Sequence, residues 1–272
     1  MDTHEEFEDY DGGSVYDGNL NFAILTSYTD NVAGSGIVWV VQTDDKDSGF
    51  ALVSGLERPV NACFDKHNHL LYVVDAATDD QGFIYQYDIT WDGDETFELT
   101  EDTYTLVYQG SAATDCTTDR VGNLYFATVD NHIYGISYVD LYKRVADVNQ
   151  ELLDETSIAG CTGIDIRDDG EILFANNENV DTLGTLVGMY WYGAELLDDK
   201  EVKIQLTAGS AKTIATSWTD IYYTSANKLF DYNYETEASR EIARNFVRPS
   251  SIAFGGDEVW VADNGTGYVY RF

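Results

Sequence analysis

The side chains that could do chemistry stand in small polar clusters spread along the chain. Asp65, His67 and His69 form the pattern Asp-x-His-x-His, and residues two apart in an extended segment share one face. Imidazole and carboxylate groups bind zinc, but a zinc site needs a full ligand set. These residues also lie in a predicted turn, where polar side chains gather without any ligand. A solvated turn is therefore the favoured interpretation.

Two acidic segments resemble parts of calcium-binding loops, and neither completes one. They are Asp45–Gly49, and Asp165 together with Asp168–Glu171. The chain has no Gly-x-Ser-x-Gly motif and no phosphate-binding loop, and the sequence places none of its 4 histidines beside a nucleophile. Acyl or phosphoryl transfer by these arrangements is not indicated.

The elements that must position any site form a repeat. A short apolar segment that ends in glycine recurs with steps of 49 to 55 residues, at Gly55, Gly110, Gly160 and Gly209. Each is followed by a small-residue strand and then an aromatic or apolar strand. With one such strand at each end of the chain, six second strands are found: Asn21–Ser27, Leu70–Asp75, Leu124–Val129, Ile172–Asn176, Ile221–Ser225 and Val259–Asp263. A unit of about 40–50 residues with four strands is typical of a β-propeller blade, which buries both faces only when neighbours stack on it.

The sequence therefore predicts an all-β fold, a six-bladed β-propeller with four-stranded antiparallel blades. Residues 13–272 form its single domain. The last blade lacks a fourth strand, because the chain ends after Gly267–Arg271. The acidic segment 1–12 either closes the ring by supplying an outer strand through Glu5–Tyr10, or is a disordered tail, and both readings stay open.

One stretch breaks the strand pattern. Between residues 141 and 153, apolar residues recur at helical spacing: Leu141, Val145, Val148, Leu152 and Leu153. We expect a short amphipathic helix here, inserted between the third and fourth strands of blade 3. Thr156–Ala159 is then the predicted fourth strand. Packing of the helix on the ring is favoured over binding to a partner.

Several strand motifs resemble known propeller repeats. Val259–Gly265 followed by Tyr268–Phe272 looks like an NHL repeat, whose pattern is an aromatic strand ending in Asp, a Gly/Asn turn and Val-x-x-Phe. Ser217–Tyr223 is similar to the YWTD repeats of lipoprotein-receptor propellers, although Trp-Thr-Asp precedes the strand here. Arg58-Pro59 and Arg248-Pro249 occupy the same position four blades apart, where a strand start tolerates proline. The resemblance implies a six-bladed ring.

The repeat also resembles the regucalcin and paraoxonase-like group of Ca²⁺-dependent lactonases and phosphotriesterases. That resemblance implies an ion held by Glu, Asn and Asp side chains at the inner ends of the first strands. When the first strands are aligned, Asn61 matches Asp115, Gly163 and Ser251, with Lys212 near that position. The channel-lining candidates are therefore Asn61, Asp115, Lys212 and Ser251, and the metal-ligand candidates are Asn61 and Asp115.

A calcium site is incomplete on these residues. Ca²⁺ takes about 6–8 oxygen ligands, Gly163 offers no side chain, and Lys212 would repel a cation. A water-filled channel or one bridged by Lys–Asp contacts is the favoured interpretation, because buried charges are normally paired. Calcium is retained as the one cofactor that the sequence raises.

The net charge of −34 limits the partners. A phosphate backbone repels such a surface, so nucleic acid is excluded as a partner, and anionic membranes are unfavourable too. No apolar run approaches the roughly 20 residues of a membrane span. Another protein, self-assembly and cations remain. Acidic side chains that merely solvate the blade loops are the ordinary reading of this charge.

The 3 cysteines, Cys63, Cys116 and Cys161, have no zinc-like spacing and lie on or beside predicted innermost strands. Counted from Asp65 and Asp119, Cys63 and Cys116 are one residue out of phase and so occupy opposite strand faces. We therefore expect no Cys63–Cys116 disulfide. One disulfide with one free thiol remains open, so the redox compartment is not settled.

The sequence indicates function less clearly than fold. The favoured hypothesis is a non-catalytic propeller that binds another protein or builds an assembly, secreted or extracellular, although no signal peptide opens the numbered chain. The alternatives are a calcium-dependent hydrolase of the lactonase or phosphotriesterase kind, and a carbohydrate-binding propeller. Asn264-Gly265-Thr266 is either a glycosylation acceptor at Asn264 or the Asn-Gly turn of a hairpin.

Overall fold

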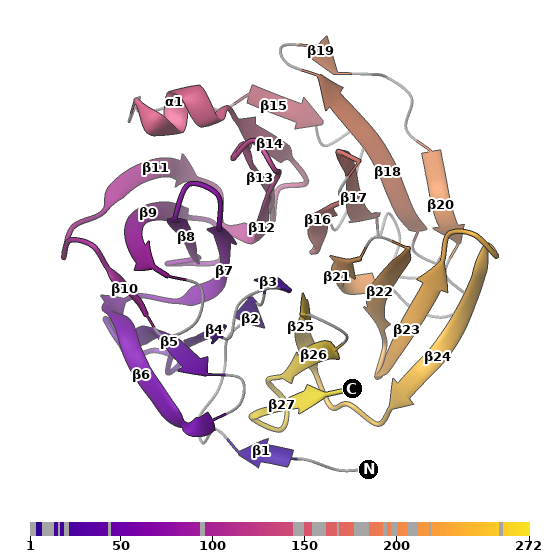
Figure 1. The fold of residues 1–272 in the computed structure, drawn as a ribbon, viewed down its shortest axis with the longest axis horizontal. Helices are drawn as coiled ribbons and strands as arrows, with labels where there is room; N and C mark the ends of the chain where they lie inside the picture. Colours follow the sequence, from indigo (N-terminus) through magenta and orange to yellow (C-terminus); the bar gives the residue numbers. More distant parts are fainter. Residues whose placement is uncertain are drawn as a thin grey trace.

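The computed structural model describes residues 4–6, 14–15, 17–18, 22–42, 45–92, 96–143, 150–153, 162–167, 169–176, 185–192, 195–196, 201–205, 211–217, 219–255 and 258–272. Six small sheets stand around a common axis like the blades of a propeller, as Figure 1 shows. The predicted all-β, six-bladed architecture is confirmed. In the ranges just given, no helix is long and apolar enough to cross a membrane.

The first three blades follow one another along the chain, each with its first strand innermost. Blade 1 contains β2 (Ser14–Val15), β4 (Phe22–Ser27), β5 (Gly36–Gln42) and β6 (Asp45–Leu56). Blade 2 contains β7 (Pro59–Asp65), β8 (Leu70–Asp75), β9 (Gly82–Trp91), β10 (Phe97–Leu99) and β11 (Thr105–Gly110), with β10 and β11 both paired to β9. Blade 3 contains β12 (Ala113–Thr118), β13 (Leu124–Thr128), β14 (Ile133–Ile136) and β15 (Gln150–Leu153).

The remaining three blades complete the ring. Blade 4 contains β16 (Ile164–Ile166), β17 (Glu171–Asn176), β18 (Thr185–Tyr192), β19 (Glu195–Leu196) and β20 (Glu201–Gln205). Blade 5 contains β21 (Ala211–Thr216), β22 (Asp220–Ser225), β23 (Lys228–Asn233) and β24 (Ala238–Arg244). Blade 6 contains β25 (Pro249–Gly255), β26 (Glu258–Asp263) and β27 (Tyr268–Arg271).

The N-terminal segment contributes to blade 6 at both of its edges. β1 (His4–Glu6) pairs antiparallel with β27 on the outside, with His4 opposite Tyr270. β3 (Asp17–Gly18) pairs in parallel with β25 on the inside. The two ends of the chain therefore meet in one sheet (Figure 1). Residues 7–10 of the predicted outer strand lie outside the described ranges.

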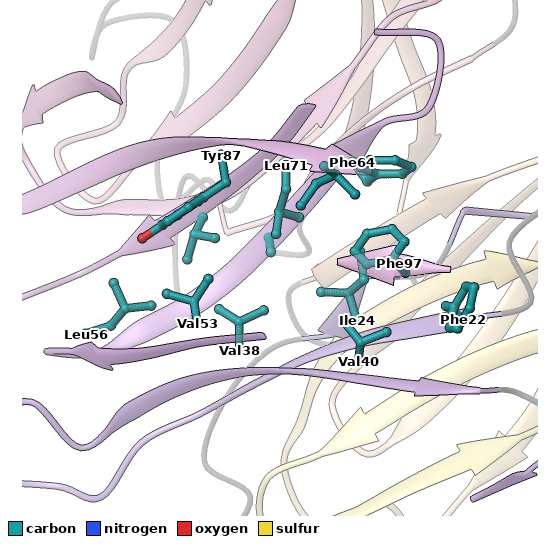
Figure 2. Close-up of a cluster of buried hydrophobic side chains, with 13 residues drawn as sticks. Phe22, Ile24, Val38, Val40, Val53, Leu56, Phe64, Leu71, Tyr87 and Phe97 are labelled. Carbon is teal, nitrogen blue, oxygen red and sulfur yellow. The ribbon is translucent and has the colours of Figure 1, made fainter. Parts of the chain in front are cut away.

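Neighbouring blades meet through opposite faces, because each sheet is rotated about the axis relative to the last. In β8, Leu71 and Val73 join the core shared with blade 1, whereas Leu70, Tyr72 and Val74 join the core shared with blade 3. Every residue of β8 is buried, as expected of a strand with a blade on each side. Figure 2 shows the core between blades 1 and 2, where Phe22 and Val40 face Leu71 and Phe97.

In blades 2 and 6, an aspartate side chain holds the backbone at the Arg-Pro dipeptide through two hydrogen bonds, and we call this arrangement the backbone clamp. Asp75, at the end of β8, accepts hydrogen bonds from the backbone N–H groups of Glu57 (3.1 Å) and Arg58 (2.6 Å). Asp263, at the end of β26, accepts the same pair from Val247 (2.8 Å) and Arg248 (2.6 Å). The aspartate that ends the second strand thus fixes the loop that delivers the first strand.

The predicted short helix is present, and its position is different. α1 spans Tyr138–Tyr142, with Ser137 as its N-cap. Gln150–Leu153, which the apolar spacing assigned to the helix, forms β15 and pairs with β14. The outer edge of β14 offers backbone hydrogen bonds that a helix here would leave unmade, so sheet pairing overrides the local periodicity. The predicted fourth strand at 156–159 lies outside the described ranges.

Candidate functional site at the ring axis

The innermost strands of four blades carry an irregularity in the same register. The pairing shifts between Pro59 and Asn61 in β7, Ala113 and Asp115 in β12, Ala211 and Ile214 in β21, and Pro249 and Ser251 in β25. A bulge bends a strand and re-aims a side chain. It therefore sets the direction of the polar residue that follows, which is Asn61, Asp115 and Ser251 in three of these blades.

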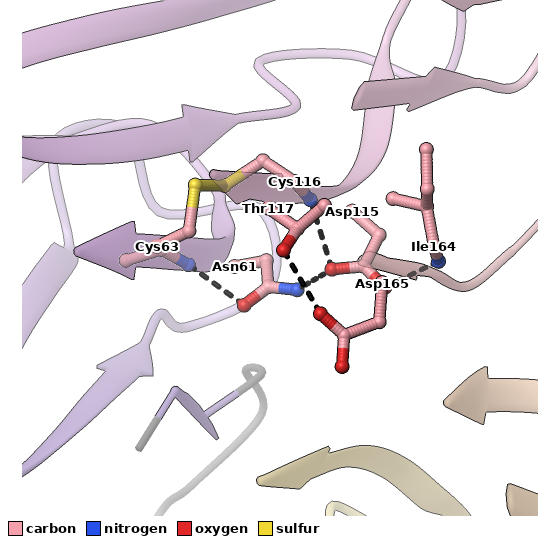
Figure 3. Close-up of a disulfide and its surroundings, with 8 residues drawn as sticks. Asn61, Cys63, Asp115, Cys116, Thr117, Ile164 and Asp165 are labelled. Atoms are coloured by element: carbon pink, nitrogen blue, oxygen red, sulfur yellow. Dashed lines mark hydrogen bonds between the residues drawn. A yellow bond between two sulfur atoms is a disulfide. The ribbon is translucent and has the colours of Figure 1, made fainter. Parts of the chain in front are cut away.

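Asn61 and Asp115 contact each other directly, as Figure 3 shows. The Asn61 side-chain amide donates to Asp115 Oδ1, and Asn61 Oδ1 accepts from the Ala62 N–H (2.7 Å). Asp115 Oδ1 also accepts from the Cys116 N–H (2.9 Å), and Asp115 Oδ2 accepts from the Ile164 N–H in blade 4 (3.0 Å). Both side chains are buried. The pair thus joins blades 2, 3 and 4.

A second aspartate, Asp165 in β16, continues the linkage. Its Oδ1 accepts from the Thr117 hydroxyl of blade 3 (2.9 Å) and from the Ile166 N–H (2.8 Å). Its Oδ2 accepts from the Thr216 N–H of blade 5 (2.7 Å) and from the Thr216 hydroxyl (3.0 Å). Sequence reasoning placed Asp165 in a partial calcium loop and missed this role. The sequence alignment contained a signal for this role: Asp165 lies two residues after Gly163, as Thr117 lies two residues after Asp115, so the two side chains occupy the same position in neighbouring blades.

Blade 5 differs from the sequence alignment by one residue. Thr213 occupies the register of Asn61, and its hydroxyl accepts from the Ile252 N–H of blade 6 (3.1 Å). The candidate Lys212 is exposed, whereas the candidate Ser251 is buried. Gly163 holds the register in blade 4, where an added Cβ would lie 2.9 Å from the Thr213 Cα. Only glycine allows β16 and β21 to approach so closely. Whether the four candidates line a channel stays a prediction.

Burial dominates the electrostatics of the two aspartates. Removal from water raises the pKa of Asp115 well above its ordinary value, and the nearby Asp165 charge raises it further, against the N–H groups of Ile164 and Cys116. Desolvation also raises the pKa of Asp165, while its hydrogen bonds lower it. Two carboxyl groups beside each other resist ionisation together.

The raised pKa of Asp115 predicts a pH-dependent contribution to stability. The folded state keeps a proton that the unfolded chain releases near pH 4, so this contribution is complete below that pH and is lost as the pH rises through the folded pKa. Asp115→Asn, which cannot ionise, is expected to gain stability relative to the wild type between pH 4 and 8. Urea unfolding of both proteins across this range, with Asp79→Asn as control, measures it. A difference that stays constant with pH would contradict the assignment.

The structure corrects the prediction for the cysteines. Cys63 and Cys116 form a disulfide between β7 and β12, with their Cα atoms 5.9 Å apart (Figure 3). The two cysteines do lie on opposite faces of their own blades. Cys63 pairs with Tyr72 and Cys116 with Phe126, and both of these aromatic residues lie in the core between blades 2 and 3. The inference from phase to distance was wrong, because neighbouring blades meet through opposite faces. Residues of opposite phase are the ones that touch.

The Asp-x-His-x-His segment forms the predicted turn, and its aspartate is buried rather than solvated. Asp65 Oδ1 accepts from the N–H groups of His67 (3.0 Å) and Asn68 (3.1 Å), which closes the β7–β8 turn. The His69 ring lies edge-on against Trp91, with ring centres 5.6 Å apart. Asn264 lies in the β26–β27 turn, where its N–H donates to the Arg248 carbonyl (3.1 Å). Its glycosylation stays a prediction.

The axial residues do not supply a calcium ligand set. The Asn61 carboxamide oxygen and both Asp115 oxygens already accept hydrogen bonds from the protein. Within the described part of the chain, no three His, Cys, Asp or Glu side chains are placed to hold a metal ion together. Calcium needs about 6–8 oxygens, and these side chains hold blades together instead.

Comparison with solved structures shows the same fold. A chain of a nidogen–laminin complex matches with a TM-score of 0.70 at 14% identity, over 88% of this chain and 87% of that one. A luciferin-regenerating enzyme matches with a TM-score of 0.65 at 13% identity, over 99% and 94%. Virginiamycin B lyase from Staphylococcus aureus matches with a TM-score of 0.60 at 15% identity, over 99% and 97%.

These similarities establish the six-bladed β-propeller fold and do not indicate a function. No family model and no curated protein matches the sequence. Structural neighbours at such identities share a fold that serves both binding proteins and enzymes, so the site has to decide between them.

Proposed function

We propose that this chain is a non-catalytic β-propeller that binds another protein or builds an assembly, outside the reducing cytosol. The observation that carries the proposal is the state of the axial carboxylate. Asp115 accepts hydrogen bonds from Asn61, Cys116 and Ile164, so both of its carboxylate oxygens are bonded to residues of blades 2, 3 and 4. In a propeller hydrolase the corresponding oxygens would have to face an ion or a substrate.

Two further observations support the proposal. The disulfide between blades 2 and 3 is typical of proteins that fold in an oxidising compartment, which favours secretion. A structural neighbour comes from a nidogen–laminin complex, so a propeller of this fold occurs in a complex of two proteins. A net charge of −34 favours a basic partner over an acidic one.

Calcium titration separates this proposal from the hydrolase alternative. We expect chelator-treated protein to give no saturable calcium-binding heat by calorimetry, and no calcium-stimulated hydrolysis of a panel of lactones and phosphotriesters. Asp115→Asn should behave like the wild type in both assays, because the side chain is structural. Calcium-dependent turnover that disappears in Asp115→Asn would overturn the proposal, since an ion would then both orient the substrate and stabilise its developing charge.

A further inference from the structure

The outermost strand of blade 2 differs from the other five outer strands. β11 reads Thr-Leu-Val-Tyr-Gln-Gly and has no charged residue. The outer strands of the other blades, β6, β15, β20, β24 and β1, each include at least one Asp, Glu, Lys or Arg in the described structure. Charges on an edge strand discourage pairing with another chain. β11 therefore lacks the usual protection.

An aromatic surface lies directly beside this edge. Tyr104, which precedes β11, is 60% exposed, and its ring centre lies 4.8 Å from that of Tyr85 in an edge-on contact. Phe83 also stacks on Tyr85, with ring centres 5.9 Å apart. Leu106 pairs with Tyr85 across the strands and is 39% exposed. Open edge and apolar side chains thus form one surface, which we call the blade 2 edge.

Several carboxylates lie near the blade 2 edge. Burial is the largest cause of the raised pKa of Tyr85, and the nearby Asp75, Tyr104 and Glu57 raise it further. Burial also raises the pKa of Tyr87, with a smaller contribution from Asp102. Asp75 is committed to its backbone clamp, whereas Glu57 and Asp102 are exposed. Aromatic faces flanked by carboxylates attract ammonium and guanidinium groups.

We propose that the blade 2 edge binds an extended, basic segment of a partner protein by strand addition to β11. In the described structure β11 pairs with β9 alone, so its other side can form main-chain hydrogen bonds with an added strand. Alternate side chains of that strand then lie over Tyr104 and Leu106, where lysine or arginine meets the rings and the carboxylates. The inference rests on the proposed function and names its surface and partner chemistry.

Charge complementarity selects this occupant over a second copy of the chain. Two copies paired edge to edge would bring Glu57 and Asp102 of each copy together, and each copy has a net charge of −34. Like-charge contacts of this kind oppose association. For a basic segment, the local carboxylates and the field of the whole protein act in the same direction.

The test uses a nine-residue peptide of alternating lysine and valine, with a glutamate–valine peptide of the same length as its counterpart. We expect the lysine peptide to bind by fluorescence anisotropy and the glutamate peptide not to bind up to about 1 mM. Tyr104→Ser should weaken binding about fivefold through loss of the cation–π contact. Leu106→Lys should weaken it at least about tenfold, since it places a like charge on the edge. Hydrogen exchange should slow in β11 when the peptide is present.

Tyr142→Ser is the matched control, because Tyr142 is a tyrosine of α1 that is 72% exposed and is not one of the residues that form the blade 2 edge. It should leave peptide binding unchanged. All three substituted side chains are exposed, and circular dichroism would check that the variants fold. No binding of the lysine peptide, equal binding of both peptides, or binding indifferent to Tyr104→Ser and Leu106→Lys would each overturn the proposal. The proposed function is tested separately, by calcium binding and hydrolysis. A negative result with the peptides would therefore overturn this binding surface and leave the proposed function untouched.

Discussion

Removal of the disulfide in Cys63→Ala/Cys116→Ala is expected to lower the free energy of unfolding by about 4 kcal/mol. The bridge joins residues 53 apart in sequence, and the loss follows from the entropy that the cross-link removes from the unfolded chain. A loss of this size corresponds to roughly 10 °C in melting temperature for a protein of this length. Chemical unfolding of oxidised wild type and double variant measures it directly.

Thiol counting checks the same prediction independently. Of the 3 cysteines in the sequence, one should react with a thiol reagent in denatured, unreduced protein, and all should react after reduction. Cys161→Ala serves as the control, because it removes a cysteine and leaves the bridge. Three reactive thiols before reduction, or a double variant as stable as the wild type, would show that the two cysteines do not link the blades.

The disulfide also shows where sequence reasoning about this ring reached its limit. Alternation along a strand gives the face on which a side chain lies, and that part was correct for Cys63 and Cys116. Distance depends on how blades are rotated about the axis, which no single blade encodes. In a ring of similar sheets, one face of each blade meets the opposite face of the next, so the out-of-phase pair is the close pair.

The strands themselves were predictable because their signals are local. β8 and β26 are short apolar runs that are flanked by turn residues and end in the clamping aspartates Asp75 and Asp263. The segment 150–153 was not predictable in this way. Its leucines fit a helix stripe, and only the unpaired edge of β14, which is defined by tertiary structure, makes it the strand β15.

The axial site was predicted in part, for a similar reason. Aligning the repeats brought Asn61 and Asp115 into one register, and the structure places the two side chains in contact. The alignment placed Lys212 near that position, whereas Thr213 holds the register in β21. Asp165 was assigned to a loop, since its partners Thr117 and Thr216 lie in other blades.

Substitution of the axial aspartate tests whether those hydrogen bonds hold the ring together. Asp115→Ala is expected to lower the free energy of unfolding at neutral pH by about 3 kcal/mol. The change removes the acceptor for the Cys116 and Ile164 N–H groups and for the Asn61 amide. Each buried donor left without a partner costs about 1–3 kcal/mol. Relief from burying a carboxyl group that resists ionisation offsets part of this loss.

Asp79→Ala is the matched control, because the Asp79 side chain is 90% exposed and its ion pair with Arg58 lies at the surface. Such pairs contribute about 0–1 kcal/mol, so this variant should remain close to the wild type. A similar loss of stability in both variants would show that Asp115→Ala acts through the change in net charge and not through its hydrogen bonds. A gain in stability for Asp115→Ala would show that the cost of the buried carboxyl exceeds the value of its hydrogen bonds. A loss confined to Asp115→Ala, with no calcium-dependent activity in either protein, is the combination that a structural axis requires.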